Sequence, residues 1–388
     1  MPISAPVIHS KLPDVGTTIF SVMSKLAQEH GAINLSQGFP DFPIDSELAN
    51  QVSAAMAAGH NQYAPMPGLP ALRQALAAKL QASGSPVDAE TQITITAGAT
   101  QALFTAFAAL LQPGDEAIVF DPSYDSYVPS IQVQGARAIR IPLRAPEFVI
   151  DWQRVAAAVT PHTRMIVINN PGNPSTAVLS ADDLTELANL AEQHNLLVLS
   201  DEVYEHLVYD EARHHSVLAD PRLAPRSLAV FSFGKTFHAT GWKIGYCAGA
   251  AALMSEFRKV HQYLVFSVNT PAQHALATYL ADASHYTSLP AFYQAKRDIL
   301  RQGLANGPLR LLPCRGTYFQ LVDYSALPSH LSELDDADFA IWLTREAGVA
   351  AIPLSPFYAE RCGHKLIRLC FAKQTATLQA ATARLASL

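Results

Sequence analysis

Between residues 93 and 249 the chain alternates short apolar runs with blocks of helical length. Several runs are rich in Ile, Val, Leu and Phe and are bounded by polar residues or glycine, which is typical of strands buried on both faces. Helical blocks, such as residues 100–111 before Pro113 and Gly114, separate many of them. This alternation predicts an α/β domain with a mostly parallel sheet between helices. The predicted strands are residues 93–98, 116–121, 136–143, 164–170, 196–202, 227–233 and 244–249.

The flanking parts of the chain have other patterns. The first 45 residues are rich in Pro and Gly and predict an arm, with a short strand that enters a turn-rich loop over residues 33–43. After about residue 290, long helices with a few isolated strands predict a smaller α+β lobe. We therefore expect an N-terminal arm and part of the small domain in residues 1–45, a large ligand-binding domain in residues 46–290 and a small C-terminal domain in residues 291–388.

Composition excludes several classes of protein. Hydrophobic residues make up 49% of the 388-residue chain and charged residues 15%, so the chain can bury enough apolar surface to fold. The net charge is −6, so the chain lacks the excess of basic residues that is typical of nucleic-acid-binding proteins. No apolar stretch is long enough to span a membrane, and the N-terminus lacks the features of a secretory signal. We expect a cytoplasmic protein with four reduced thiols, because no CxxC pair is formed by Cys247, Cys314, Cys362 and Cys370.

Candidate chemistry gathers where the predicted strands end, which is where open parallel sheets bind ligands. Ala99 and Thr100 begin a helix after the first strand, and such amides either bind an anion or simply form a turn that Thr100 caps. Asn173 stands between two prolines in a loop that presents its amide or is only a turn. Asp201 follows a mostly apolar run, so it is either a buried carboxylate that needs a cation or a cap of the next turn.

Lys235 follows the sixth strand of this series. Burial there would remove its proton and leave a nucleophilic amine, whereas in the following loop it would be an ordinary surface lysine. Taken together, an anion cradle, an amide, a buried acid with a nearby tyrosine and an amine are the groups that pyridoxal phosphate needs. The combination favours a site for this cofactor more than any single residue does.

Seven motifs extend this interpretation. The segment SFGKTFHATGWKIGY, together with NNPGNPS, SDEVYEHLVY and GTYFQLVDY, resembles the signatures of fold-type-I pyridoxal-phosphate aminotransferases of class I/II. The segments INLSQGFPDFP, NQYAPMPG and FDPSYDSY are most similar to the branch that contains bacterial methionine aminotransferases and the kynurenine aminotransferases, including glutamine transaminase K. The resemblance runs from about residue 17 to residue 373, and the combination of motifs is specific.

The resemblance implies a role for each matching residue. Lys235 would bond covalently to the cofactor aldehyde and then move a proton at the substrate Cα, and Asp201 would hold the ring nitrogen with a low pKa. The remaining cofactor contacts are implied for the phosphate (Ala99, Thr100, Ser232, Lys243 and, from the other subunit, Tyr63), the ring face (Tyr124) and the phenolic oxygen (Asn173, Tyr204).

Substrate contacts follow from the same resemblance. Arg368 would hold the substrate α-carboxylate, a task that suits a planar guanidinium, although it could instead be an ion-paired strand arginine. Gly38 and Asn173 would assist at that carboxylate. Phe20, Tyr63 and the partner subunit's Phe266 would line the side-chain pocket. Where aspartate aminotransferases carry a second arginine, this chain has Phe266 and Ser267, which favours apolar or aromatic donors over aspartate. Members of the kynurenine branch often have a histidine at the position of Ser267, so this chain departs from their pattern.

The function that follows is a homodimeric aminotransferase. It would move the amino group of methionine and other large apolar or aromatic L-amino acids to a 2-oxo acid by a ping-pong mechanism. A β-lyase of cysteine S-conjugates or cystathionine-type substrates, and a kynurenine or glutamine transaminase, are alternatives on the same fold. A cofactor-sensing regulator would need a basic helix-turn-helix domain that the sequence does not contain. No metal site is expected, because His214 and His215 have no third ligand nearby.

Overall fold

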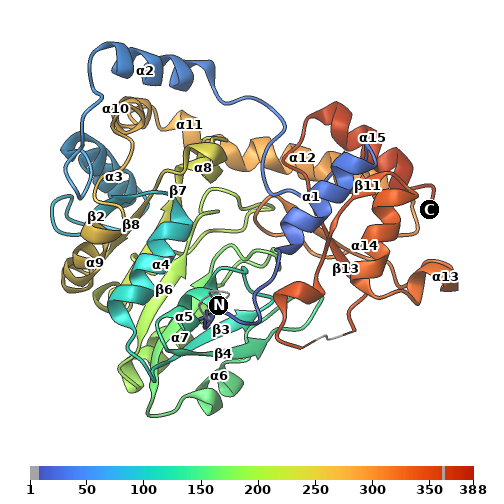
Figure 1. Ribbon diagram of the computed structural model, residues 1–388, viewed down its shortest axis with the longest axis horizontal. Coiled ribbons are helices and arrows are strands. Elements are labelled where there is room, and N and C mark those ends of the chain that lie inside the picture. The colour runs from blue at the N-terminus through green and yellow to red at the C-terminus, as the bar shows by residue number, and fades with distance from the viewer. Residues whose placement is uncertain (1–7, 361–362) are drawn as a thin grey trace, which may run out of the picture.

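The computed structural model describes residues 8–360 and 363–388. Its largest sheet has seven strands, and each predicted strand between residues 93 and 249 is present with its ends within two residues of the expectation (Figure 1). Only β8 runs antiparallel to its neighbours β2 and β7, so the predicted mostly parallel α/β architecture is confirmed. In spatial order the strands are β2 (Ile93–Thr96), β8 (Gly245–Gly249), β7 (Ser227–Ser232), β6 (Leu197–Asp201), β5 (Thr163–Asn169), β3 (Glu116–Asp121) and β4 (Arg137–Pro142).

Helices cover both faces of this sheet because its side chains alternate between two apolar cores. Ala117 and Val119 of β3 contribute to one core, whereas Ile118 contributes to the other. The first core is completed by α4 (Ala99–Leu110), α5 (Tyr127–Val133) and α9 (Ala251–Leu264). The second is completed by α3 (Pro70–Ala82), α6 (Trp152–Ala158), α7 (Ala181–Gln193) and α10 (Thr270–Tyr279).

A smaller sheet lies beside the large one and is antiparallel. It consists of β12 (Ile352–Pro353), β13 (Leu366–Cys370), β10 (Phe319–Asp323) and β9 (Arg310–Leu311). Around it lie α12 (Leu289–Leu304), α14 (Asp336–Arg345) and α15 (Thr375–Leu385), with a third apolar core between them (Figure 1). Outside the N-terminal segment the remaining α-helices are α2 (Ser46–Ala57) and the short α8 (Phe233–Thr236), α11 (Ser284–Thr287) and α13 (Ser329–Ser332).

The N-terminal segment joins the small lobe. Strand β1 (Ile33–Asn34) pairs in parallel with β11 (Val349–Ala350), and helix α1 (Ile19–Glu29) packs on α14. No helix was expected before residue 45, because Pro and Gly dominated the interpretation of this segment. They flank α1 rather than interrupt it: Thr18 caps its first turn, and Met23 and Ala27, one turn apart, are buried. The domain limits at residues 45 and 290 stay a prediction, and residue 290 falls inside α12.

The helices and the cysteines bear on the expected environment of the chain. Within the described residues, every helix is too short or too polar to traverse a lipid bilayer. Three cysteines, Cys247, Cys314 and Cys370, are buried and unpaired, and the expected thiol of Cys362 lies outside the described residues.

Glycine is required where β8 passes between its neighbours. A Cβ on Gly249 would lie 2.2 Å from the carbonyl oxygen of Ser227 in β7. We predict that Gly249→Ala destabilises the fold by about 1–3 kcal/mol or more, because backbone in the sheet must shift. Gly16→Ala is the control, since nothing lies within 4 Å of the added methyl group. Thermal unfolding measures both variants, and equal melting temperatures would contradict the close strand packing.

Candidate active site

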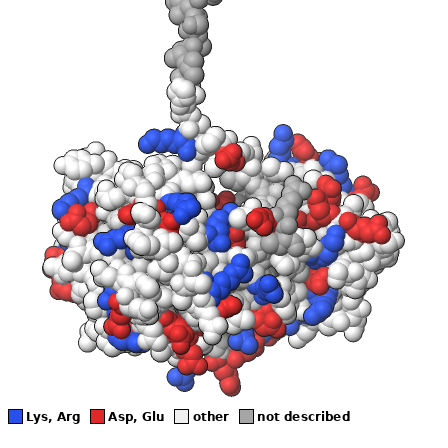
Figure 2. Space-filling view, turned by 90° about the horizontal axis from the view of Figure 1, so that it is seen from below, with Lys and Arg blue, Asp and Glu red and all other residues white. Residues whose placement is uncertain are grey.

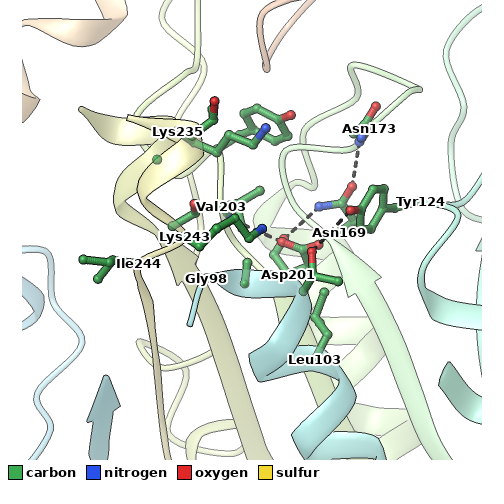
Figure 3. Close-up of a pocket in the computed structure, with 16 residues that line it drawn as sticks. Gly98, Leu103, Tyr124, Asn169, Asn173, Asp201, Val203, Lys235, Lys243 and Ile244 are labelled. Atoms are coloured by element: carbon green, nitrogen blue, oxygen red, sulfur yellow. Dashed lines mark hydrogen bonds between the residues drawn. The ribbon is translucent and has the colours of Figure 1, made fainter. Parts of the chain in front are cut away.

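A cavity with about 680 Å³ of empty space opens at the carboxyl ends of the parallel strands, between α4, β5, β6 and β7 (Figure 3). The cavity collects the residues that the strand ends predicted together with those that the resemblance implied for the cofactor, which are Ala99, Thr100, Tyr124, Asn173, Asp201, Tyr204, Ser232, Lys235 and Lys243. Because they come from six separate stretches of the chain, it is the fold that brings them together.

One end of the cavity is electropositive. Helix α4 begins there at Ala99 after Gly98, whose φ of 79° gives the backbone a left-handed turn. The first amides of a helix have no partner within the helix and carry the positive end of its dipole. A Cβ on Gly98 would lie 3.4 Å from Lys243 Nζ, so the ammonium group lies directly over this helix start. Thr100 Oγ1 and Tyr124 Oη are 3.4 Å apart beside it. This end of the cavity is suited to a phosphate group.

Asp201 lies at the floor of the cavity and is 4% exposed. Tyr127 Oη donates a hydrogen bond of 2.6 Å to its carboxylate, and the amide of Val203 donates another of 3.3 Å. Burial outweighs these donors and the more distant Lys235, and it raises the pKa of Asp201 to about 6. The expected low pKa belongs to a carboxylate paired with a cationic ring nitrogen, so it stays a prediction for the cofactor-bound protein. A cationic ring nitrogen would supply the missing charge, so this carboxylate fits the cofactor that the sequence predicted.

Lys235 follows β7 in the short helix α8, and its ammonium points into the cavity. Its Nζ donates to Tyr318 Oη at 2.9 Å and to the carbonyl of Gly38 at 3.3 Å. Burial, together with the positive charges of Arg368 and Lys243, lowers the pKa of Lys235 to about 8. The amine therefore exists in its neutral, nucleophilic form to a substantial degree near pH 8.

The amide of Asn173 and the hydroxyl of Tyr204 lie at the wall between these groups. Asn169 fixes this wall: its Oδ1 accepts from the amide of Asn173 at 2.6 Å, and its Nδ2 donates to the carbonyl of Asp201 at 2.9 Å (Figure 3). Burial raises the pKa of Tyr204 far above its ordinary value, which keeps its hydroxyl protonated. Both side chains can therefore donate a hydrogen bond to an oxygen of a bound ring.

Arg368 reaches this wall from β13 of the small lobe and is 1% exposed. It donates to Asn173 Oδ1 at 2.6 Å and to the carbonyl of Ser36 at 3.3 Å, and its guanidinium carbon lies 3.8 Å from the centre of the Phe319 ring. Phe20 lies on another side of the group at 5.3 Å. Among the described residues Arg368 forms no salt bridge, so its interpretation as an ion-paired strand arginine is wrong. A buried guanidinium without an anion is suited to bind a carboxylate.

Two expected residues lie apart from the cavity of their own chain. Tyr63 and Phe266 meet edge to face with ring centres 5.1 Å apart, and they are 80% and 45% exposed. Neither lines the cavity. Their expected roles toward the active site of another subunit are not tested by a single chain and stay predictions.

Three residues of the site were not singled out from the sequence. Tyr127 bonds Asp201, Asn169 links Asp201 to Asn173, and Tyr318 holds Lys235. All three stand inside motifs that were used for other reasons, namely FDPSYDSY, NNPGNPS and GTYFQLVDY. Tyr127 meets Asp201 from 74 positions away and Tyr318 meets Lys235 from 83 positions away, so only packing between separate segments brings these pairs together.

Comparison with known proteins matches residues 30–385 to the family described as aminotransferase class I and II. The methionine aminotransferase of Escherichia coli (strain K12) is 54% identical over 382 residues, which cover 98% of each chain. Kynurenine–oxoglutarate transaminase 1 of Mus musculus is 37% identical over 398 residues, which cover 94% of this chain and 93% of that protein. A crystal structure from Escherichia coli, described as identifying a methionine aminotransferase function, has a TM-score of 0.96 and 53% identity over 99% of this chain and 100% of that one.

The environment of Lys235 has a measurable consequence. With a pKa of about 8, about half of its amine is neutral at pH 8, against less than about 1% for an ordinary lysine. We predict that an acylating reagent modifies Lys235 with a rate that levels off above pH 8, in protein from which bound small molecules have been removed. Mass spectrometry of peptides measures the rate, with the exposed Lys25 as the comparison. A rate at Lys235 that continues to rise tenfold per pH unit above pH 9 would refute the assigned pKa.

Proposed function

This chain belongs to the class I and II aminotransferases, and we propose that it transfers the amino group of methionine and other large apolar or aromatic L-amino acids to a 2-oxo acid. The observation that carries the proposal is the meeting of a buried acid, Asp201, and a partly neutral amine, Lys235, in one cavity with an anion-binding helix start. The 54% identity to a methionine aminotransferase supports the choice of donor.

Pyridoxal phosphate is the cofactor that these residues fit. When bound, it supplies an aldehyde that takes up the amino group and an electron-withdrawing ring that makes the substrate Cα acidic. Lys235 would hold the cofactor and then move the proton at the substrate Cα, since its pKa near 8 lets it accept and return a proton near neutral pH. Asp201 would balance the charge of the ring nitrogen. The other contacts would come from Ala99, Thr100, Ser232 and Lys243 to the phosphate, Tyr124 to the ring face, and Asn173 and Tyr204 to the phenolic oxygen.

The substrate side of the proposal rests on Arg368. Its guanidinium would bind the α-carboxylate that every amino acid donor shares, with Gly38 and Asn173 beside it. The side chain would then lie among aromatic rings that include Phe20. An apolar donor such as methionine fits this environment better than aspartate.

A homodimer completes the proposed site. The exposed edge-to-face pair of Tyr63 and Phe266 would contribute to the active site of the partner subunit, which would explain aromatic rings left in solvent on a single chain. The buried free thiols of Cys247, Cys314 and Cys370 support the expectation of a reducing compartment such as the cytoplasm.

Donor preference tests the proposal directly. We predict transamination of one 2-oxo acid with methionine as donor at a kcat/KM roughly 100-fold or more above that for aspartate, because burying an unpaired carboxylate costs several kcal/mol. Phenylalanine, kynurenine, glutamine and histidine complete the screen, and Lys235→Ala is the inactive control. Release of pyruvate and ammonia from cysteine S-conjugates, measured in the same samples, would reveal a β-lyase. A preference for aspartate would contradict the proposed donor class.

Arg368 provides a second test. We predict that Arg368→Ala lowers kcat/KM by roughly 10- to 100-fold for every donor, mainly through KM, because a hydrogen bond to a charged group contributes about 1.5–3 kcal/mol. Steady-state kinetics with methionine and phenylalanine measure the effect, and Arg144→Ala, at an exposed position, is the control. A loss confined to one donor would mean that Arg368 contacts the side chain rather than the α-carboxylate.

A further inference from the structure

A second buried acid lies directly behind the cavity. Glu202 follows Asp201 at the end of β6, and successive side chains of a strand point to opposite faces. Asp201 therefore enters the cavity, while Glu202 lies on the other face beside Ser200, whose hydroxyl donates to Glu202 Oε1 at 2.8 Å. Glu202 is 0% exposed. Its role is not part of the chemistry described above.

Among the described residues, the carboxyl group of Glu202 meets hydrogen-bond donors, and its ion-pair contact is to His214, which is charged only if protonated. The amide of Val217 donates to Oε1 at 3.2 Å, and the hydroxyl of Ser216 also contacts the carboxyl group. The buried ammonium of Lys79 is committed to Glu205 at 2.7 Å. An ionised Glu202 would therefore be a buried, uncompensated charge, which is costly.

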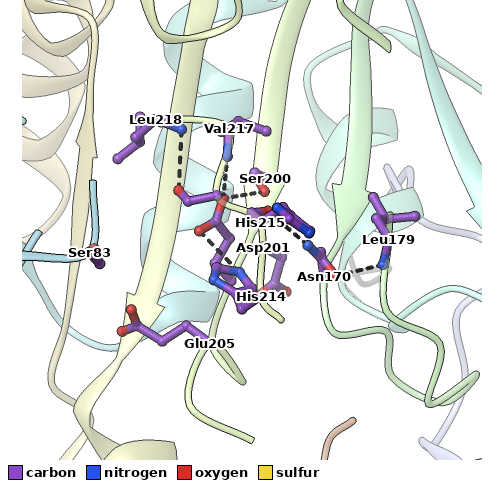
Figure 4. A network of polar contacts seen from close by, with 12 residues as sticks. Ser83, Asn170, Leu179, Ser200, Asp201, Glu205, His214, His215, Val217 and Leu218 are labelled. Carbon is purple, nitrogen blue, oxygen red and sulfur yellow. Dashed lines mark hydrogen bonds and ion pairs between the residues drawn. The ribbon is translucent and has the colours of Figure 1, made fainter. Parts of the chain in front are cut away.

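The contacts of His214 indicate that the carboxyl group of Glu202 carries a proton. Its Nε2 lies 3.4 Å from Glu202 Oε2, and neither atom has any other partner among the described residues (Figure 4). His214 also forms a hydrogen bond with the backbone of Asn170. The backbone N–H of Asn170 already donates to the backbone carbonyl of Asp201. In the bond with His214 the carbonyl of Asn170 must therefore be the acceptor and Nδ1–H of His214 the donor. A neutral imidazole protonated on Nδ1 offers a lone pair on Nε2, which can only accept a proton from Glu202.

The pKa values agree with this assignment. Burial raises the pKa of Glu202 to about 8 and lowers the pKa of His214 to about 4, so both groups are neutral between these limits. Of the other described titratable groups, Glu205 of the following loop and Tyr246 of β8 interact with Glu202, and Lys79 of α3 and His206 lie beside Glu205. Lys79 and Glu205 neutralise each other, and burial keeps His206 and Tyr246 uncharged.

The loop of residues 214–217 is also attached to β5. Asn170 Nδ2 donates to the carbonyl of His215 at 2.9 Å, and Asn170 Oδ1 accepts from the amide of Leu179 at 3.0 Å (Figure 4). The loop thus spans the ends of β5 and β6 on the face away from the cavity. The residues beside these attachments, Asn169 and Asp201, are the ones that enter the cavity.

We propose that Glu202 is a positioning residue which, as a neutral carboxylic acid, donates its proton to His214 Nε2 and so fixes the ends of β5 and β6 that carry Asn169 and Asp201. The proton state and the attachment of the loop do not depend on the proposed function. Only the consequence for cofactor binding rests on it.

Substitution of Glu202 and Glu205 separates a neutral acid from an ionised one. Glu202→Gln keeps the acceptor for Ser200 and Val217 and supplies an N–H for His214, so we expect an unfolding temperature close to that of the wild type. Glu202→Ala removes both and should lower the unfolding temperature by several degrees. Glu205→Gln is the matched contrast, because it leaves the buried Lys79 without its counter-charge and should also lower it. A Glu202→Gln protein as unstable as Glu202→Ala, or unable to fold, would overturn the proposal.

The pH dependence of stability tests the proton itself. The folded-state pKa of Glu202 is raised from 4.5 to about 8, so its protonated form stabilises the fold fully below pH 4.5 and loses that contribution as pH rises toward 8. Relative to Glu202→Gln, the wild-type unfolding temperature should therefore decline between about pH 4.5 and pH 8 and then level. A constant difference over this interval would show that Glu202 is ionised and would overturn the proposal.

Cofactor retention tests the positioning role in the same variants loaded with pyridoxal phosphate. Glu202→Ala should bind pyridoxal phosphate roughly tenfold more weakly, the effect of about one lost hydrogen bond, and should shift the pH titration of its visible absorbance. Glu202→Gln should restore both. If Glu202→Ala loses stability but binds and titrates as the wild type does, the positioning role is wrong. If the wild type binds no pyridoxal phosphate while the pH result holds, the proposed function fails and the protonated acid stands.

Discussion

Burial at one edge of the sheet governs the chemistry of this protein. The carboxyl ends of β5, β6 and β7 bring Asp201 and Lys235 into the same water-poor cavity, and the loss of solvent acts on them in opposite directions. It raises the pKa of the acid to about 6 and lowers the pKa of the amine to about 8. Each group therefore has a pKa near neutrality, and among the described residues neither forms an ion pair. The cationic ring nitrogen of such a cofactor would pair with the acid, and its aldehyde would react with the amine.

The second lobe is necessary because half of the contacts to these groups come from it. Tyr318, next to β10, holds Lys235, and Arg368 of β13 reaches Asn173 across 195 positions of sequence. Gly38, in the N-terminal segment, accepts hydrogen bonds from both Lys235 and Tyr318. Arg368 also donates to the carbonyl of Ser36, two residues before Gly38, so the N-terminal segment contacts both the arginine and the reactive amine. Any movement of the small lobe would change the surroundings of the amine and of the arginine together.

The sequence predicted the large sheet and most of the cavity for the same physical reason. Buried parallel strands appear as apolar runs, and their carboxyl ends meet at one edge, so the residues after Asn169, Ser200 and Ser232 could be placed without coordinates. The aminotransferase family implied by the motifs is confirmed by the comparisons. Helix α1 was missed because its amphipathic pattern is short and lies among Pro and Gly. The partners Tyr127 and Tyr318, and the raised pKa of Asp201, depend on non-local packing, which no local pattern records.

The two glutamates behind the cavity show why burial alone does not decide a proton state. Glu202 and Glu205 are three residues apart, and burial opposes the charge of each. Glu205 contacts the ammonium of Lys79, and its pKa is lowered, whereas Glu202 faces hydroxyl, amide and imidazole groups, and its pKa is raised. Glu205 forms an ion pair because the ammonium group of Lys79 lies beside it, whereas Glu202 lacks such a neighbour among the described residues and stays a neutral acid. A neutral Glu202 adds no negative charge next to Asp201. Asp201 therefore remains the acid with which a cationic ring in the cavity would pair.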